Sequence, residues 1–231
     1  MLTTSVVIPA INEADNIAAA IESAFAAGAN EVIVSDGGST DDTVAMATAA
    51  GATKIVRSLP GRGTQQNSGA FMAKGDWLLF LHADNRLDAD CIAEMTVHAG
   101  RQGSRFLWGA FKQRIESPRP IYRWIEQGNA ARVRWRSMAY GDQAIFVRRD
   151  IFKQVGGFPD IPLMEDVELS KALRKRGKPF LLSGPVTISS RRWESHGVVK
   201  QTLKNWRLRI AHATGTHPAE LSVMYDRGGR G

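Results

Sequence analysis

Short apolar runs recur along the first 86 residues, and each is bounded by glycine or by polar residues. Uninterrupted runs of this length are typical of strands buried on both faces of a sheet. They cover residues 5–9, 31–36, 54–57 and 77–81. The segments between them have helical spacing, and the first places Ile17, Ala20, Ile21, Ala24 and Phe25 on one face. This alternation predicts an α/β fold with a mostly parallel central sheet and helices on both faces.

Glycine and polar residues mark the ends of the expected helices. Gly28 and Gly51 follow helical segments, as left-handed C-terminal caps do. Ser39 and Asp42 have the spacing of a capping box, which predicts a helix over 41–50. A further helix is expected over 65–73, after the loop at 59–64.

The pattern becomes less regular after Arg86. Helices are expected over 88–100, 165–176 and 198–214, and strands over 106–115, 143–147 and 186–190. Residues 121–136 carry an imperfect apolar stripe that is rich in Arg, Trp and Tyr. Because no linker separates the two parts, we predict a single domain over 1–225 and a disordered tail over 226–231.

The composition is that of an ordinary globular protein, with 43% hydrophobic and 23% charged residues. No apolar run has the 18 or so residues that indicate a membrane span, and residues 1–4 lack the basic region and cleavage site of a leader. The single cysteine, Cys91, excludes an intramolecular disulfide framework and suits a reducing compartment. These features favour a cytoplasmic protein.

The formal net charge of +7 is concentrated in one segment. Residues 101–149 contain 11 Lys or Arg and three acidic residues. Such a field attracts polyanions, anionic lipid surfaces or phosphorylated small molecules, and it does not choose among them.

Aromatic and basic residues interleave within this segment, namely Tyr122, Trp124, Arg132, Arg134, Trp135 and Arg136. Four interpretations stay open. They are a lid over an anionic donor, a surface for a lipid-linked acceptor or an anionic membrane, a dimer contact, and an amphipathic helix with a solvated basic face.

Carboxylates lie at the ends of three predicted elements, as Asp36, Asp84 and the pair Glu165-Asp166. Each alone is also explained as a helix cap or as a first-turn acid that complements the helix dipole. Open α/β sheets, however, bind ligands at the carboxyl ends of their strands. There, one carboxylate could contact a nucleoside, one a metal on a diphosphate leaving group, and one the proton of an acceptor hydroxyl. We interpret Asp84 as the carboxylate that holds the metal on a nucleotide diphosphate.

The chain lacks the sequence signatures of other nucleotide-binding proteins. The chain has neither the G-x-G-x-x-G turn nor the G-x-x-x-x-G-K-[ST] loop. A nucleotidyltransferase acting on a sugar phosphate normally needs a glycine-rich, basic loop after the first strand, where this chain has Pro-Ala-Ile-Asn-Glu at 9–13. A basic nucleic-acid-binding protein is the other alternative, suggested by a pI of about 9.9, although no helix-turn-helix, zinc or RNP signature supports it.

Five motifs carry a family resemblance: VVIPAINE at 6–13, VSDGGSTD at 34–41, LHAD at 81–84, MEDVEL at 164–169 and RRWE at 191–194. Through them the chain resembles family-2 glycosyltransferases of the GT-A fold, and a compact bacterial subgroup of these, over nearly its whole length. The resemblance implies a Rossmann-like nucleotide-binding half over 1–86 and an acceptor half over 87–225. It also implies transfer of a sugar from a nucleotide-diphosphate sugar to an acceptor hydroxyl, with inversion and with Mn²⁺ or Mg²⁺.

The resemblance also implies roles for individual residues. The positions that border the nucleoside are Pro9, Asn12 or Glu13, and Asp36. Asp84 takes the place of the metal-binding Asp that ends the D-x-D motif, and Asp166, next to Glu165, that of the general base in the Glu-Asp motif.

The chain departs from the family pattern at His82, where many relatives have Asp. His82 either contacts the ribose or a phosphate, or packs at the strand end. His196 is a candidate for a further metal ligand. Arg192 and Trp193 belong to a shortened form of the Q-x-x-R-W motif of processive relatives, without its Gln, which disfavours processive polymer synthesis.

Three further residues are candidates for substrate contacts. Arg62 and Asn67 lie near a helix start, whose free N–H groups suit a phosphate or nucleoside, although a solvated loop arginine fits equally well. Asp142 lies where the family places acceptor or donor-sugar contacts, or simply in the turn before a strand. The acceptor hydroxyl is of unknown type and includes lipid-linked candidates. Peripheral contact with the inner face of the membrane is compatible with the charge, and no specific nucleic acid is expected.

Overall fold

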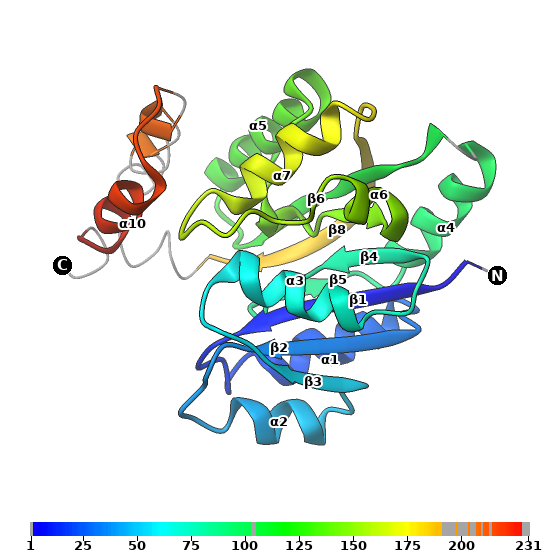
Figure 1. The fold of residues 1–231 in the computed structure, drawn as a ribbon. Helices are drawn as coiled ribbons and strands as arrows, with labels where there is room; N and C mark the ends of the chain where they lie inside the picture. The colour runs from blue at the N-terminus through cyan, green and yellow to red at the C-terminus, as the bar shows by residue number, and fades with distance from the viewer. Residues whose placement is uncertain are drawn as a thin grey trace.

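The structure is a computed structural model that describes residues 2–102, 105–190 and 214–227, together with residues 197, 203, 207–208 and 210–212. Within this part of the chain, one eight-stranded sheet has the order β3-β2-β1-β4-β7-β6-β8-β5 (Figure 1). The strands are β1 (Thr4–Ala10), β2 (Glu31–Asp36), β3 (Lys54–Arg57), β4 (Trp77–Phe80), β5 (Asn85–Leu87), β6 (Trp108–Glu116), β7 (Phe146–Arg148) and β8 (Phe180–Ser189).

Helices connect most of these strands. They are α1 (Ile17–Ala26), α2 (Thr43–Ala49), α3 (Arg62–Met72), α4 (Cys91–Gln102), α5 (Pro120–Arg136), α6 (Arg149–Gln154), α7 (Glu165–Arg174) and α10 (Pro218–Arg227), with a short 3-10 turn, η2 (Gly141–Gln143), before β7. No helix among the described residues is both long and apolar enough to cross a bilayer.

The sheet has a parallel half and a mixed half. β1 pairs in parallel with both β2 and β4, and β2 pairs in parallel with β3. β7 then runs antiparallel to β4 and β6, whereas β8 is parallel to β6 and antiparallel to β5. The predicted α/β architecture, a mostly parallel sheet flanked by helices, is confirmed.

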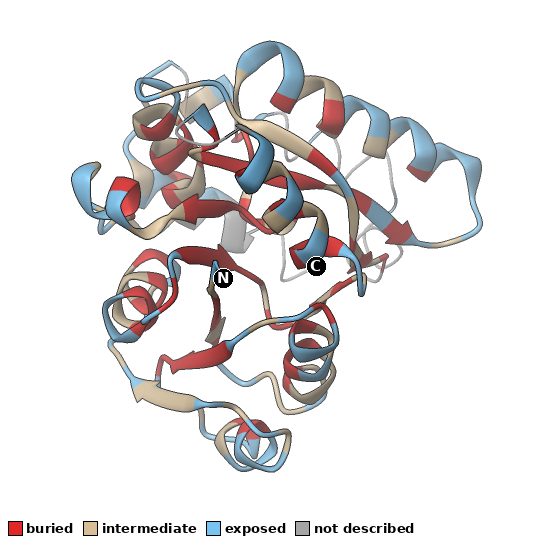
Figure 2. Ribbon diagram, turned by 90° about the vertical axis from the view of Figure 1, so that its right-hand side faces the viewer, coloured by how far each residue is buried: buried red, intermediate tan, exposed pale blue. Residues whose placement is uncertain are grey.

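The core lies on both faces of the sheet because side chains along a strand alternate in direction. On β1, Val6 and Ile8 pack with the buried residues of α1, α2 and α4. Val7 points the other way, into the cluster that α3, α6 and α7 cover. Figure 2 shows the consequence, with strand ribbons mostly buried and the outer sides of the helices exposed.

Several local predictions are wrong in detail. The capping box is not formed, because α2 begins only at Thr43 with Asp42 as its N-cap, and the Ser39 hydroxyl instead accepts a hydrogen bond from the Asn12 amide. Phe25 lies at the edge of the buried stripe of α1 and is 37% exposed. The helix expected over 65–73 begins three residues earlier, at Arg62.

Some elements were not expected, and others have different bounds from those predicted. β5 is a short polar strand, and β8 begins at Phe180 rather than near Val186. Residues 149–154 form α6, and α10 includes the first two residues of the segment predicted as a tail. Residues 228–231 lie outside the described part of the chain, as does much of the helix predicted over 198–214, of which residues 203, 207–208 and 210–212 are helical.

Candidate active site

The carboxyl ends of β1, β2 and β4 meet at one edge of the sheet. Ala10, the last residue of β1, is in register with Asp36, the last residue of β2. β4 continues this edge, since Phe80 is in register with Val7 and the Leu81 amide donates to the Val7 carbonyl at 3.0 Å. The motifs that follow the three strands therefore emerge side by side, where parallel α/β sheets bind ligands.

The loops after β1 and β2 are fastened to each other. Asn12 has a left-handed backbone, with φ of 53°, and its side-chain oxygen accepts the Thr40 amide at 2.9 Å. In return, its own amide donates to Ser39 Oγ at 3.0 Å. Asn is one of the few residues that adopt this conformation readily. The first two sequence motifs thus form one structural unit.

The carboxylates of Asp36 and Glu13 both accept hydrogen bonds from nearby residues of the chain. The Asp36 carboxylate is 2% exposed and accepts the Gly38 amide at 3.1 Å and the Ser39 amide at 3.1 Å. Glu13 Oε2 accepts from the Asn16 side chain at 2.8 Å. Pro9 lies half-buried in β1, opposite Ser35. Their predicted contacts with a nucleoside stay predictions.

Gln65 joins α3 to both strand ends, and sequence reasoning missed it. Its side-chain amide donates to the carbonyls of Ala10 and Ser35, each at 2.9 Å, and the residue is 4% exposed. Its neighbours Thr64, Gln66 and Asn67 are polar as well, so no local pattern distinguished Gln65 or indicated which carbonyls it would reach. Gln65 fixes the distance between β1 and β2 where their loops begin.

Three distant segments converge on Gly141. The Gly141 amide donates to Asp166 Oδ2 at 2.7 Å, which joins η2 to the first turn of α7. A side chain at Gly141 would place its Cβ 2.6 Å from His82 Nε2 and 3.5 Å from Asp166 Oδ2. His82 and Asp166 therefore lie on the same small patch, and the absence of a side chain at Gly141 makes this approach possible.

Asp84 lies in the turn between β4 and β5, next to this patch. The turn contacts η2 twice, through His82 and through Asn85, whose side chain donates to the Asp142 carbonyl at 3.5 Å. Asp84 itself is half-buried, and its carboxylate makes no hydrogen bond or ion pair with the described residues. Asp84 thus lies two residues after His82, in the turn that contacts η2, with a carboxylate that no described residue engages.

Glu165, the first residue of α7 and the neighbour of Asp166, pairs with Arg62. Its side chain is 2% exposed, and Oε1 lies 3.5 Å from Arg62 Nη1. The Arg62 side chain is 43% exposed. Burial, helped by the charge of Asp166, raises the pKa of Glu165 to about 7, and the Arg62 guanidinium opposes the rise. Arg62 therefore pairs with a carboxylate of the site and is not merely a solvated loop residue.

The side-chain amide of Asn67 forms two hydrogen bonds with the main chain of Phe158. Its Nδ2 donates to the Phe158 carbonyl at 2.8 Å, and its Oδ1 accepts the Phe158 amide at 2.9 Å. This reciprocal pair holds α3 against the loop that precedes α7. Arg192, Trp193 and His196 lie outside the described residues.

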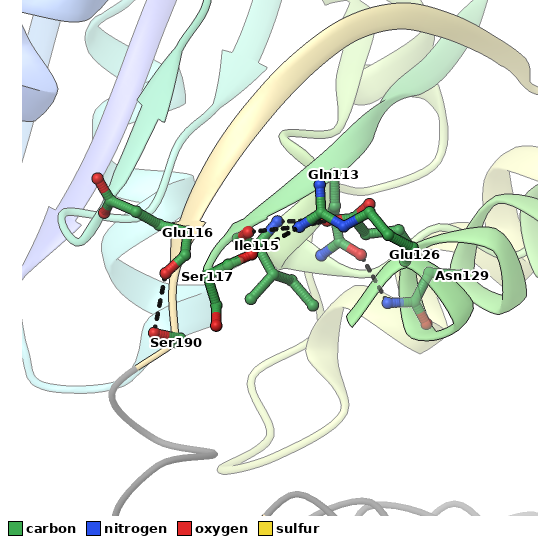
Figure 3. Close-up of polar contacts among 8 residues, drawn as sticks. Gln113, Ile115, Glu116, Ser117, Glu126, Asn129 and Ser190 are labelled. Carbon is green, nitrogen blue, oxygen red and sulfur yellow. Dashed lines mark hydrogen bonds and ion pairs between the residues drawn. The ribbon is translucent and has the colours of Figure 1, made fainter. Parts of the chain in front are cut away.

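A polar network supports η2 from the side of α5. The Arg132 side chain donates to Gln143 Oε1 at 2.8 Å, and the side chain of Gln113 donates to the Asp142 carbonyl at 3.1 Å. Figure 3 shows how this network continues, with Asn129 donating to Gln113 and the amide of Ile115 donating to Glu126. The turn that carries Gly141 is thus held by α5 and β6.

A known family matches about two thirds of the chain, including the motifs that follow β1, β2 and β4. The model of glycosyl transferase family 2 matches residues 5–156. The chain belongs to this family. The predicted family is thereby confirmed.

Relatives and solved structures agree with this assignment. A PGL/p-HBAD biosynthesis glycosyltransferase of Mycobacterium tuberculosis is 32% identical over 165 residues, which are 67% of this chain and 62% of that protein. The chain thus spans about three fifths of the length of such relatives. A glycosyltransferase of Rickettsia felis, described as uncharacterized, is 38% identical over 97 residues, or 42% of this chain and 34% of that protein.

Two solved structures show the same fold. TarS of S. aureus superposes with a TM-score of 0.65 at 17% identity, covering 82% of this chain and 61% of that one. Glucosyl-3-phosphoglycerate synthase from Mycobacterium tuberculosis, in complex with Mg²⁺ and uridine-diphosphate, gives a TM-score of 0.55 at 21% identity, covering 81% of this chain and 69% of that one. At these identities the likeness shows the GT-A fold.

Proposed function

We propose that this protein transfers a sugar from a nucleotide-diphosphate sugar to an acceptor hydroxyl, with inversion at the anomeric carbon and with a divalent cation. The observation that carries the proposal is the convergence of His82, Gly141 and Asp166 beside Asp84, at the edge where β1, β2 and β4 end. Family membership supports it, as does the uridine-diphosphate bound by glucosyl-3-phosphoglycerate synthase, a protein of the same fold.

Asp166 is the proposed general base. Its Oδ2 accepts the Gly141 amide at 2.7 Å, and its Oδ1 accepts the Val167 amide at 2.7 Å. Two main-chain donors fix the carboxylate plane, and each oxygen retains a further lone pair for the proton of an attacking hydroxyl. A single base on one side of the sugar and a leaving group on the other give inversion.

Asp84 is the proposed protein ligand of the cation. Among the described residues, no cluster of three His, Cys, Asp or Glu could hold a metal without help. A single available carboxylate nevertheless fits Mg²⁺ or Mn²⁺, because such ions are commonly held by one or two carboxylates together with substrate phosphates. When bound there, the cation would offset the charge of the departing diphosphate. This chain would contribute the carboxylate of Asp84 and the surrounding turn.

The nucleoside is proposed to lie over the joined loops after β1 and β2. Pro9, Asn12, Glu13 and Asp36 border that surface, which the Asn12–Thr40 and Asn12–Ser39 hydrogen bonds hold in one conformation. Preformed loops bind a ligand without the entropy cost of ordering them.

Two isosteric variants test these roles separately. Nucleoside diphosphates are first screened by thermal shift with and without Mn²⁺, and the one that stabilises the protein defines the donor. Asp84→Asn should abolish the Mn²⁺-dependent part of that stabilisation. Asp166→Asn should leave it nearly intact while lowering sugar transfer at least about a thousandfold, since a general base is lost. Asp90→Asn, an exposed carboxylate before α4, is the matched control.

Two outcomes would contradict the proposal. Full activity in Asp166→Asn would require another base, and Mn²⁺-independent nucleotide binding in the unmodified protein would remove the role of Asp84. The anomeric configuration of the product, read by NMR, decides between inversion and retention.

A further inference from the structure

The outer face of α5 carries large apolar side chains in water. Ile121 is 46% exposed, Trp124 is 76% exposed and Trp135 is 84% exposed. At about 100° per residue these three positions fall within an arc of roughly 60°, so they form one stripe along the helix. The opposite face is buried through Tyr122 and Val133. Two largely exposed tryptophans on one stripe indicate a surface that contacts another molecule or a membrane.

Arginines flank this stripe. Arg134 and Arg136 lie on either side of Trp135, both are exposed, and neither has a hydrogen bond or ion pair with the described residues. Arg119, just before the helix, is exposed as well. The segment 101–149 around α5 contains 11 Lys or Arg and only three acidic residues, so its net charge is strongly positive. The covering surface should therefore be negatively charged.

This combination fits one kind of partner. Tryptophan prefers the boundary between headgroups and acyl chains, and each arginine near an anionic leaflet adds electrostatic attraction. A second copy of the chain fits poorly, because a symmetric contact would bring the same arginines together. An anionic bilayer matches both the apolar stripe and its basic flanks.

We propose that α5 docks on an anionic lipid surface, with Ile121, Trp124 and Trp135 entering the headgroup region and Arg134 and Arg136 contacting lipid phosphates. This inference concerns where the protein works and does not depend on the proposed reaction. It also has a structural consequence. Arg132, which holds η2, lies about 20° around the helix from Ile121, at the margin of the stripe, so docking would bring η2 close to the lipid.

Vesicle flotation tests the proposal directly. The intact protein should float with vesicles of phosphatidylcholine and phosphatidylglycerol, and should stay behind with phosphatidylcholine alone. Trp124→Ala/Trp135→Ala should weaken the partition by at least about tenfold. Arg134→Gln/Arg136→Gln should weaken it by about fivefold for each arginine, and 0.5 M salt should act likewise. Phe71→Ala, on α3 and 87% exposed, is the control and should float like the unmodified protein.

Other results would overturn the proposal. One is absence of flotation with anionic vesicles, and another is equal flotation of the tryptophan variant and the control. A third is a concentration-dependent dimer in sedimentation velocity that the tryptophan variant loses, which would make the stripe a contact between copies. A fourth is a single-stranded DNA affinity that falls with the tryptophans while vesicle binding does not, which would assign the surface to nucleic acid. Because all these substitutions are on the surface, unchanged thermal unfolding confirms that each variant is folded.

Discussion

The guanidinium carbon of Arg132 lies 3.6 Å from the centre of the Tyr140 ring, which places a charged helix side chain over the residue before η2. The same guanidinium reaches Gln143 at the other end of the turn, and Gln143 is fully buried. One arginine on α5 thus holds both ends of the turn whose Gly141 amide orients Asp166.

Arg132→Lys should lower the turnover of donor about tenfold while leaving the affinity for the nucleotide unchanged. An ammonium group cannot stack on Tyr140 and donate to Gln143 at once, so η2 would no longer hold Asp166 in one orientation. Steady-state kinetics of nucleoside diphosphate release separates kcat from KM. Arg134→Lys, exposed on the same helix, is the control, and equal kinetics of the two variants would refute a positioning role for Arg132.

Gly141→Ala should lower activity by about a hundredfold and destabilise the protein by about 1–3 kcal/mol, as overpacking typically does. The added Cβ would lie 2.6 Å from His82 Nε2, so either the histidine or η2 must shift. Gly128→Ala is the matched control. Its Cβ meets nothing within 4 Å, and the exchange in the middle of α5 should be neutral or stabilising by up to about 1 kcal/mol.

A second variant separates steric conflict from other effects of the alanine. In Gly141→Ala/His82→Ala the clash is absent, so the melting temperature should recover most of what Gly141→Ala loses. If the double variant melts at as low a temperature as the single one, the approach of His82 to Gly141 does not explain the loss of stability.

The parallel half of the fold could be predicted because its signals are local. Each strand there is a short apolar run, and Gly28 and Gly51 have φ of 97° and 82°, as expected of left-handed caps. β2 and β3 have the predicted bounds. Burial on both faces makes such strands almost continuous in apolar residues, and the sequence therefore shows them plainly.

The second half could be predicted less well because its pairing is not local. β5 is three residues long and is defined by its partner β8, about 100 residues later. The hydrogen bonds of Gly141 with Asp166, and of Gln65 with Ala10 and Ser35, likewise join loops or helices that leave no periodic trace. The predicted capping box is replaced by a contact of this kind, since Ser39 accepts the Asn12 amide from another loop and α2 begins only at Thr43. The sequence motifs predicted that the acidic residues lie near one edge of the sheet. The hydrogen bonds that position them are visible only in the fold.

Gln65→Met should lower the free energy of unfolding by about 2 kcal/mol and weaken nucleotide binding. The exchange keeps the side-chain length but removes both donors, so the carbonyls of Ala10 and Ser35 lose their buried partner. Urea unfolding measures the first effect and titration calorimetry the second. Gln127→Met, exposed on α5, should change neither quantity. If Gln65→Met binds nucleotide normally, the link between the two strand ends does not shape the nucleoside surface.

Glu165 should make the protein less stable as the pH rises from about 4.5 to above 7. Burial raises the pKa of this carboxyl to about 7 in the folded protein from an ordinary 4.5, so between these values the folded state holds a proton that the unfolded chain has released. Stability falls with pH wherever the folded state binds more protons, and a shift of this size corresponds to a loss on the order of 3 kcal/mol. Glu165→Gln removes the ionisation and should therefore be the more stable protein at pH 8, with little difference at pH 4.5.

Urea unfolding at several pH values measures this difference, with Glu22→Gln, an exposed glutamate of α1, as the control. The control should follow the unmodified protein throughout, because Glu22 is exposed and lies on α1, away from the Arg62–Glu165 pair. The gap between Glu165→Gln and the unmodified protein should open only through the window between 4.5 and 7. Parallel stability curves would mean that the Arg62 guanidinium, 3.5 Å away, keeps Glu165 charged in spite of its burial. In that case the pair, and not a neutral acid, would support Asp166.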